Sequence, residues 1–197
     1  MISTMRTENN TLINELLTIT DACTASAKNF RQLPPDMLNF KEAPERWSIL
    51  ECLEHLNRYG DYYLPEIEKA IMSGKTSNNP LTFSSGVLGN YFANLMKVKG
   101  GKIIRMKTPA DKNPAGSELT PITIDRFIKQ QEKLRSLLEQ ARKVDLTGTK
   151  VPISLTRFLK LRAGDTFRFF VYHIERHIRQ AEKAKESAGR RSVVESQ

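Results

Sequence analysis

Long apolar runs are missing from this chain of 197 residues, and the longest, such as residues 169–172, contain only a few residues. A helix that crosses a membrane needs about 20 consecutive apolar residues. The first ten residues are polar and lack the apolar stretch of a signal peptide. From these absences we expect a cytoplasmic protein that neither spans nor binds a membrane.

Cysteine is also scarce, with Cys23 and Cys52 as the only two. Two cysteines in a chain of this length do not form the disulfide framework of a small secreted domain, so we expect both thiols to be reduced. With 39% hydrophobic and 27% charged residues, the composition fits one globular core. We expect a single helical domain over residues 1–187 and a polar, basic tail over residues 188–197.

The charge is unbalanced, because 31 Lys and Arg residues against 22 Asp and Glu residues give a formal net charge of +9. Such an excess can indicate an anionic partner. One basic stretch lies mid-chain, and its members are Lys97, Lys99, Lys102, Arg105 and Lys107. It lacks the interleaved aromatic residues on which nucleic-acid bases stack, so we expect no nucleic-acid partner.

Four segments have the apolar spacing of amphipathic helices, at about residues 10–32, 47–74, 123–144 and 164–187. Ser48 followed by Glu51 is a capping-box pattern at the start of the second. Pro65 lies inside this segment, where it should kink or interrupt the helix. Asp165 is a suitable N-cap for the fourth. With no alternating strand pattern and no clear assignment for residues 151–159, the sequence predicts an all-α four-helix bundle.

The connection between the second and third segments, residues 75–121, is long and holds many of the prolines and glycines. A short helix at about residues 84–97 is expected within it, because Val87, Tyr91 and Leu95 recur at helical spacing. Connections of this length are uncommon in compact domains and are often functional. It could equally be the crossover that lets two neighbouring helices run parallel.

The chain has only three histidines, His55, His173 and His177. His173 and His177 are four residues apart on one helix, so they lie on the same face, and a helical wheel places them at the edge of the buried stripe. His55 lies near a face edge of the second helix. One ligand from one helix and two from another can form a metal site in a bundle core. Three protein ligands leave a coordination position open, as in catalytic zinc sites.

Each of these histidines could instead have a purely structural role. A pair spaced by four is more often a packing or surface coincidence, and a lone helical histidine is more often only hydrogen-bonded. On the helical wheel Glu175 and Arg176 point away from the pair. Ile174 occupies the position where zinc proteases carry their catalytic glutamate, so the pair is not that motif.

Other side chains near His55 could join such a site. Cys52 could be a fourth ligand, although a small core residue is the more common role of a buried cysteine. Tyr59 and Tyr62 could line a pocket, although tyrosines at helical spacing more often only pack. We expect Trp47, at the start of the second helix, to pack under the bundle.

Two sequence motifs resemble a known family. Residues 45–56, ERWSILECLEHL, resemble the second-helix signature of the DinB/YfiT-like superfamily, with Trp47, the helix start at Ser48 and His55 on the second turn. Residues 173–180, HIERHIRQ, resemble its C-terminal signature H-x-x-x-H-x-x-Q. The resemblance covers about residues 10–187. It implies a four-helix bundle in up-down-down-up order, with a long crossover between helices 2 and 3 that departs from the shortest members.

The resemblance also implies a function. It implies one divalent metal ion, nickel, zinc or iron, on His55, His173 and His177, and a frequent homodimer. Members of known activity include thiol transferases that attach bacillithiol or mycothiol to electrophiles, and metal-dependent hydrolases and isomerases. The implied partners are thus a low-molecular-weight thiol and an electrophilic small molecule. From their charge, Lys97, Lys99 and Arg105 could meet the carboxylates of such a thiol, although a solvated loop is the more common role of such residues. The alternative is a non-catalytic, metal-stabilised binding or stress-response module.

Overall fold

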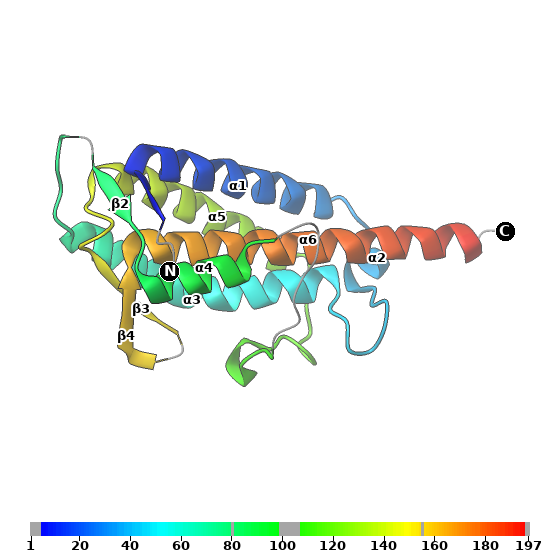
Figure 1. Cartoon of the computed structure of the whole chain (residues 1–197). Helices are drawn as coiled ribbons and strands as arrows, with labels where there is room; N and C mark the ends of the chain where they lie inside the picture. The colour runs from blue at the N-terminus through cyan, green and yellow to red at the C-terminus, as the bar shows by residue number, and fades with distance from the viewer. Residues whose placement is uncertain (1–4, 80, 99–106, 155, 196–197) are drawn as a thin grey trace.

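The computed structural model describes residues 5–79, 81–98, 107–154 and 156–195, which are mostly helical as predicted (Figure 1). Four long helices, α1 (Asn9–Phe30), α3 (Ile49–Ser73), α5 (Ile122–Gln140) and α6 (Ala163–Glu195), lie side by side. Both α1 and α3 pack against α5 and α6. The shorter elements are α2 (Pro35–Asn39), α4 (Val87–Met96) and the 3-10 turns η1 (Ala110–Lys112) and η2 (Ala141–Lys143).

The start of α3 is fixed by the capping box that the sequence predicted. The Ser48 backbone N–H donates to the Glu51 carboxylate at 2.9 Å, and the Glu51 N–H donates to Ser48 Oγ at 3.2 Å. These bonds satisfy two of the free amides of the first turn. The helix is not interrupted at Pro65. Pro65 and Asp61, whose carbonyl loses its helical partner, are both exposed, so water can take that hydrogen bond.

Two antiparallel strand pairs were not predicted. β1 (Arg6–Glu8) pairs with β2 (Thr82–Ser84), and β3 (Lys150–Ile153) pairs with β4 (Thr156–Arg162). The first pair is too short to show an alternating pattern. In the second, the register shifts between Pro152 and Ile153, which breaks the alternation in the segment left unassigned.

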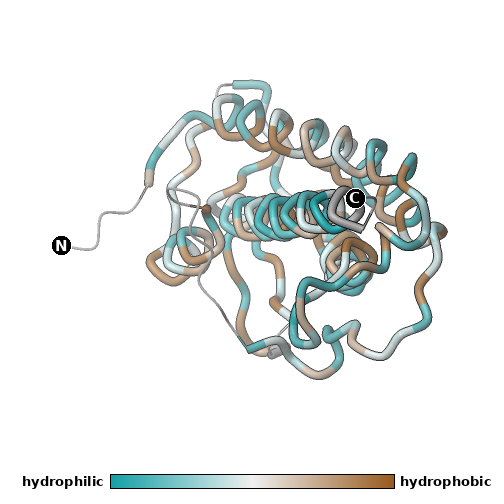
Figure 2. Tube along the Cα trace, turned by 90° about the vertical axis from the view of Figure 1, so that its right-hand side faces the viewer, coloured by the Kyte–Doolittle hydropathy of each residue, from teal (hydrophilic) through white to brown (hydrophobic). Residues whose placement is uncertain are grey.

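Helix α6 differs from the prediction at both ends. Asp165 is not an N-cap but lies inside the first turn, fully buried, where its carboxylate accepts the Gly86 N–H at 2.8 Å and pairs with Arg168. At the other end the helix continues to Glu195, past the expected end near residue 187. Adding residues to an existing helix needs no new nucleation. This C-terminal part points toward the viewer in Figure 2 and is largely hydrophilic.

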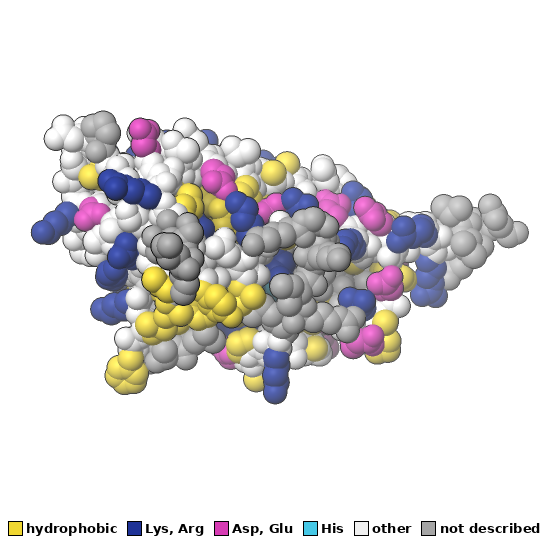
Figure 3. Space-filling model, in the orientation of Figure 1, with side chains coloured by type: hydrophobic (Ala, Val, Ile, Leu, Met, Phe, Trp, Pro, Cys, Tyr) yellow, Lys and Arg dark blue, Asp and Glu magenta, His cyan; other side chains and the backbone are white. Residues whose placement is uncertain are grey.

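Helix α4 is present where the sequence predicted it. Gly89, Asn90, Ala93 and Met96 face inward. Val87 and Tyr91 are exposed, with Leu88 beside them, and Figure 3 shows a hydrophobic area over this part of the molecule. Gly89 lets α4 pack closely on α6, because a Cβ at this position would meet the Asp165 side chain. In the described part of the chain, no helix has the length and apolar character that crossing a membrane requires.

Candidate metal centre

The three histidines come together in the interior. His55 is on the second turn of α3, and His173 and His177 are on adjacent turns of α6, which packs against α3. One ring nitrogen from each lies within 4.8 Å of the other two. His55 and His173 are buried and His177 is half-buried. The structure thus brings together all three residues that the sequence singled out.

The outer nitrogen of two of these rings is held by a hydrogen bond. His55 Nδ1 lies 2.8 Å from the backbone carbonyl of Lys112 in η1, and His177 Nδ1 lies 3.0 Å from the side-chain Oε1 of Gln180. Both partners are acceptors, so each Nδ1 carries the proton and each Nε2 keeps a free lone pair. Such outer hydrogen bonds are how proteins orient histidine ligands.

The donor set fits a divalent transition metal. Imidazole nitrogen suits zinc, nickel and iron alike. Two nitrogens each about 2.1 Å from one ion are about 3.4 Å apart at a tetrahedral angle, and His55 Nε2 lies 3.2 Å from His173 Nε2. His173 Nδ1 is buried without a hydrogen bond to any described residue, so this ring is positioned by packing instead.

Burial keeps the imidazoles neutral. It lowers the pKa of His55 to about 4, and this effect outweighs the opposing hydrogen bond to the Lys112 carbonyl. Burial also holds the pKa of His173 and His177 well below the usual value, and the nearby charge of Arg176 lowers both further. A neutral imidazole is the form that ligates a metal, so the site needs no deprotonation step at neutral pH.

Arg176 lies on α6 between the two histidines. The helical wheel placed it away from them, but the structure shows it buried and near enough to affect both pKa values. The reason is that α6 packs against helices on several sides, so it has no single solvent face. Its guanidinium has neither a hydrogen bond nor an ion pair with any residue that the structure describes. Its nitrogens are not among the fully enclosed polar atoms, so water still reaches this cation, and its charge favours an anion nearby.

Aromatic rings enclose the histidines. The Trp47 ring lies 4.7 Å from that of His55 and 5.6 Å from that of His177, so Trp47 borders the site. Tyr59 lies 4.5 Å from His173 and Phe169 stacks on the same ring at 5.9 Å. Packing on several sides limits rotation of the imidazoles.

Cys52 does not belong to the cluster. It is fully buried in the core, and burial raises the pKa of its thiol. Among the described residues, the group of candidate ligands holds the three histidines and no cysteine or carboxylate. Both cysteines are free thiols, as expected.

Comparison with known families agrees with this geometry. The sequence model of the DinB superfamily matches residues 19–181. The chain belongs to the DinB superfamily. The match spans the stretch between α1 and α6 and so includes all three histidines. Neither the curated proteins nor the solved structures that were compared gave a match.

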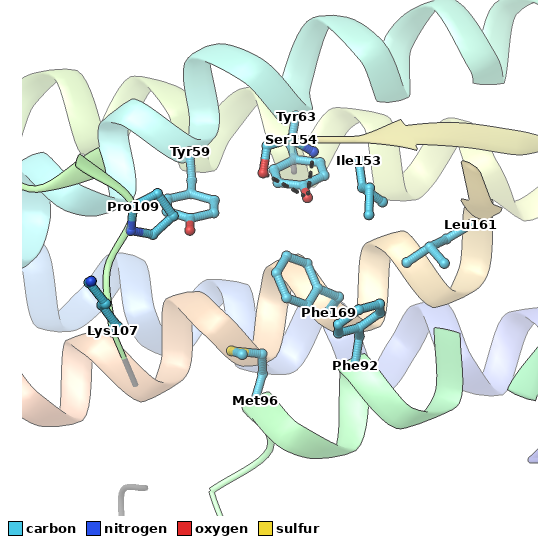
Figure 4. Close-up of a pocket in the computed structure, with 10 residues that line it drawn as sticks. All are labelled: Tyr59, Tyr63, Phe92, Met96, Lys107, Pro109, Ile153, Ser154, Leu161 and Phe169. Carbon is cyan, nitrogen blue, oxygen red and sulfur yellow. Dashed lines mark hydrogen bonds between the residues drawn. The ribbon is translucent and has the colours of Figure 1, made fainter. Parts of the chain in front are cut away.

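A pocket of this DinB-superfamily chain adjoins the histidines (Figure 4). Tyr59 and Phe169 line it and also contact the His173 ring. Tyr62, the other tyrosine that the sequence suggested, instead donates a hydrogen bond to the Ile153 carbonyl. Of the basic stretch, Lys99, Lys102 and Arg105 lie outside the described residues. Lys97 pairs with Glu15, and Lys107 lines the pocket.

Proposed function

We propose that this DinB-superfamily protein binds one divalent metal ion through His55, His173 and His177 and transfers a low-molecular-weight thiol to an electrophile. The observation that carries the proposal is the convergence of three neutral imidazoles beside an aromatic pocket. Nickel, zinc and iron all suit this donor set.

The bound metal would supply a Lewis acid that stabilises a thiolate, the nucleophilic form of a thiol. The residues of the chain orient the ligands and set the charge around the ion. Lys112 and Gln180 keep the lone pairs of His55 and His177 available. Arg176 adds a second positive charge close to the histidines, which favours an anionic ligand over a neutral one.

Hydrolysis is the less favoured enzymatic alternative. A metal-dependent hydrolase usually needs a general base beside the ion to take a proton from water. In the part of the chain that the structure describes, no carboxylate joins the histidines. A substrate thiolate requires no such base, which supports thiol transfer.

A second candidate function is non-catalytic. A metal held by α3 and α6 would clamp two helices and stabilise a binding or stress-response module. This alternative predicts a metal-dependent melting temperature without turnover.

We also propose that the helices follow the up-down-down-up order of the family and that the protein forms a homodimer. The packing of α1 and α3 against α5 and α6 supports the bundle, and light scattering after size-exclusion chromatography tests the dimer.

The first experiment is elemental analysis of full-length wild type and of His173→Ala, both purified without a histidine tag. We expect about one ion per chain in wild type and little in the variant, because removal of one of three ligands weakens binding strongly. Gln131→Ala, on α5, changes a buried polar residue that is not a ligand and should keep its metal. Absence of metal in wild type after reconstitution with nickel and zinc would overturn the proposal.

Activity is tested on metal-loaded protein with a panel of thiols and electrophiles. Thiol consumption that requires the metal and disappears in His173→Ala supports the transferase. Metal binding without any turnover favours the non-catalytic module.

A further inference from the structure

The pocket beside the histidines has the size of one aromatic ring. Its volume is about 120 Å³, and a cavity of about 150 Å³ in another protein binds benzene. Its walls come from α3, α4, α6 and the β3–β4 hairpin (Figure 4). Phe92, Phe169, Met96 and Leu161 supply apolar surface on which a planar ring can pack.

One end of the pocket is polar and positively charged. Among the described residues of its lining, only Lys107 is charged, and its ammonium makes no ion pair with any of the described side chains. The Tyr59 hydroxyl lies at the same end in Figure 4 and makes no hydrogen bond to a described residue. Burial raises the pKa of Tyr59 to about 12, so its hydroxyl remains a donor at neutral pH. The Lys107 ammonium and the Tyr59 hydroxyl are therefore two hydrogen-bond donors at one end of the pocket, and neither has an acceptor among the described residues.

The other polar groups of the lining are already satisfied. The Tyr63 hydroxyl lies 3.3 Å from Ser154 Oγ, and the Ser154 N–H donates to the same hydroxyl. Because these groups already bond to each other, they do not require a hydrogen bond from a ligand. The pocket is apolar over most of its surface and offers positive charge and a donor at one end only.

We propose that this pocket binds a substrate with a single aromatic ring and a carboxylate, the ring on Phe92 and Phe169 and the carboxylate at Lys107 and Tyr59. The proposal rests on the proposed function only in taking the ligand as the electrophilic substrate. Binding itself involves residues other than the three histidines, so it can be measured with or without metal.

The test uses three fluorinated ligands of nearly equal shape: 4-fluorophenylacetate, 4-fluorophenylacetamide and 4-fluorophenethylamine. Their dissociation constants are measured by fluorine NMR titration on the full chain, both after chelation and after zinc loading. We expect the acid to bind about fivefold more tightly than the amide, the effect of one partly exposed ion pair. The amine should bind most weakly. The preference must persist in chelated protein, because a carboxylate could otherwise bind the zinc.

Three variants test which residues cause the preference for the acid and where the ligands bind. Lys107→Met keeps the aliphatic length but removes the charge, so acid and amide should bind equally. Lys143→Met changes an exposed lysine on η2 and should leave the preference intact. Leu161→Phe adds side-chain volume that fills part of the pocket and should weaken the binding of all three ligands alike, while circular dichroism checks that the variant folds.

The proposal is overturned if wild type binds acid and amide equally, or if the preference survives in Lys107→Met. It is also overturned if Leu161→Phe folds and leaves every dissociation constant unchanged. Failure of metal binding by elemental analysis would remove the transferase but not this pocket. A preference for the acid that appears only with zinc would assign the carboxylate to the metal and contradict the role of Lys107.

Discussion

His173 has the least polar support of the three histidines, because its Nδ1 is buried without a hydrogen bond to a described residue. His55 and His177 are instead oriented by Lys112 and Gln180. Their contributions to metal affinity should therefore be tunable through these outer partners. A lost hydrogen bond at Gln180 frees the His177 ring to change its tautomer.

Gln180→Met removes the acceptor at nearly constant length and should lower metal affinity about tenfold, at the lower end for outer partners of ligands. Gln180→Glu keeps an acceptor and should retain the affinity. Competition with a chromophoric chelator measures both. Equal affinities for wild type and Gln180→Met would show that packing alone orients His177.

Cys23 gives a pH dependence of stability. Burial, with the nearby Glu175 charge, raises the pKa of its thiol from 9.0 to about 12. Between these values the unfolded chain loses a proton that the folded chain keeps, so the free energy of unfolding falls as pH rises, by about 1.4 kcal/mol per pH unit at most. Urea titrations between pH 8 and 10.5 should show a shallower fall for Cys23→Ala. Parallel curves would mean that the folded thiol ionises normally.

The residues of the site were predictable to different degrees. The three histidines could be found because the chain has no others, and Gln180 appeared in the motif of the resemblance. The Lys112 contact could not be found, because it uses a backbone carbonyl that any residue provides. Arg176 was misplaced because a helical wheel assumes one buried face, whereas α6 is contacted on several sides.

At the scale of elements, the long helices were predictable because their apolar spacing is regular and their ends carry local signals such as Ser48 and Gly74. The strands were not, since β1 and β2 are short and β3–β4 is irregular. The side of α4 that faces inward could not be predicted, because it depends on tertiary contacts. Its small residues allow close contact with α6, so its large apolar residues Val87 and Tyr91 face outward.

Gly89 is the residue that makes this contact possible. A Cβ there would lie 2.3 Å from an Asp165 carboxylate oxygen, and Asp165 is held by Gly86 and Arg168. Gly89→Ala should therefore push α4 outward and destabilise the protein by about 1–3 kcal/mol. Because α4 carries Phe92 and Met96, ligand binding in the pocket should weaken as well.

Gly189→Ala is the matched control, because a Cβ there meets nothing within 4 Å. This helical substitution should be neutral or stabilise by up to about 1 kcal/mol. Thermal and urea denaturation compare the two variants. If Gly89→Ala were as stable as Gly189→Ala, the tight contact between α4 and α6 would not hold in solution.

At the scale of the whole molecule, the candidate metal centre joins elements that are far apart in sequence. His55 and His173 are separated by 118 residues, and Lys112 adds a third segment. A metal that binds only the folded chain should stabilise all of it. A metal at this site would therefore raise the free energy of unfolding of the whole protein, whether or not the protein is an enzyme.

Zinc or nickel at 100 times its dissociation constant should raise stability by about 2.7 kcal/mol. For a chain of this size this corresponds to an increase of about 5–10 °C in melting temperature. Calorimetry after chelation and after reloading measures the shift, and His173→Ala should show almost none. An equal shift in His173→Ala would place the stabilising ion elsewhere.

The unpaired guanidinium of Arg176 has a consequence for electroneutrality. Arg176 places a cation beside the candidate metal centre, and among the described residues no carboxylate joins the three histidines, so a bound metal would favour an anion from solution. Chloride, phosphate or a buffer carboxylate would then compete with substrate for the same space. The salt chosen for an assay would therefore act as an inhibitor of variable strength, and the ionic composition around the protein would set how readily the site is filled.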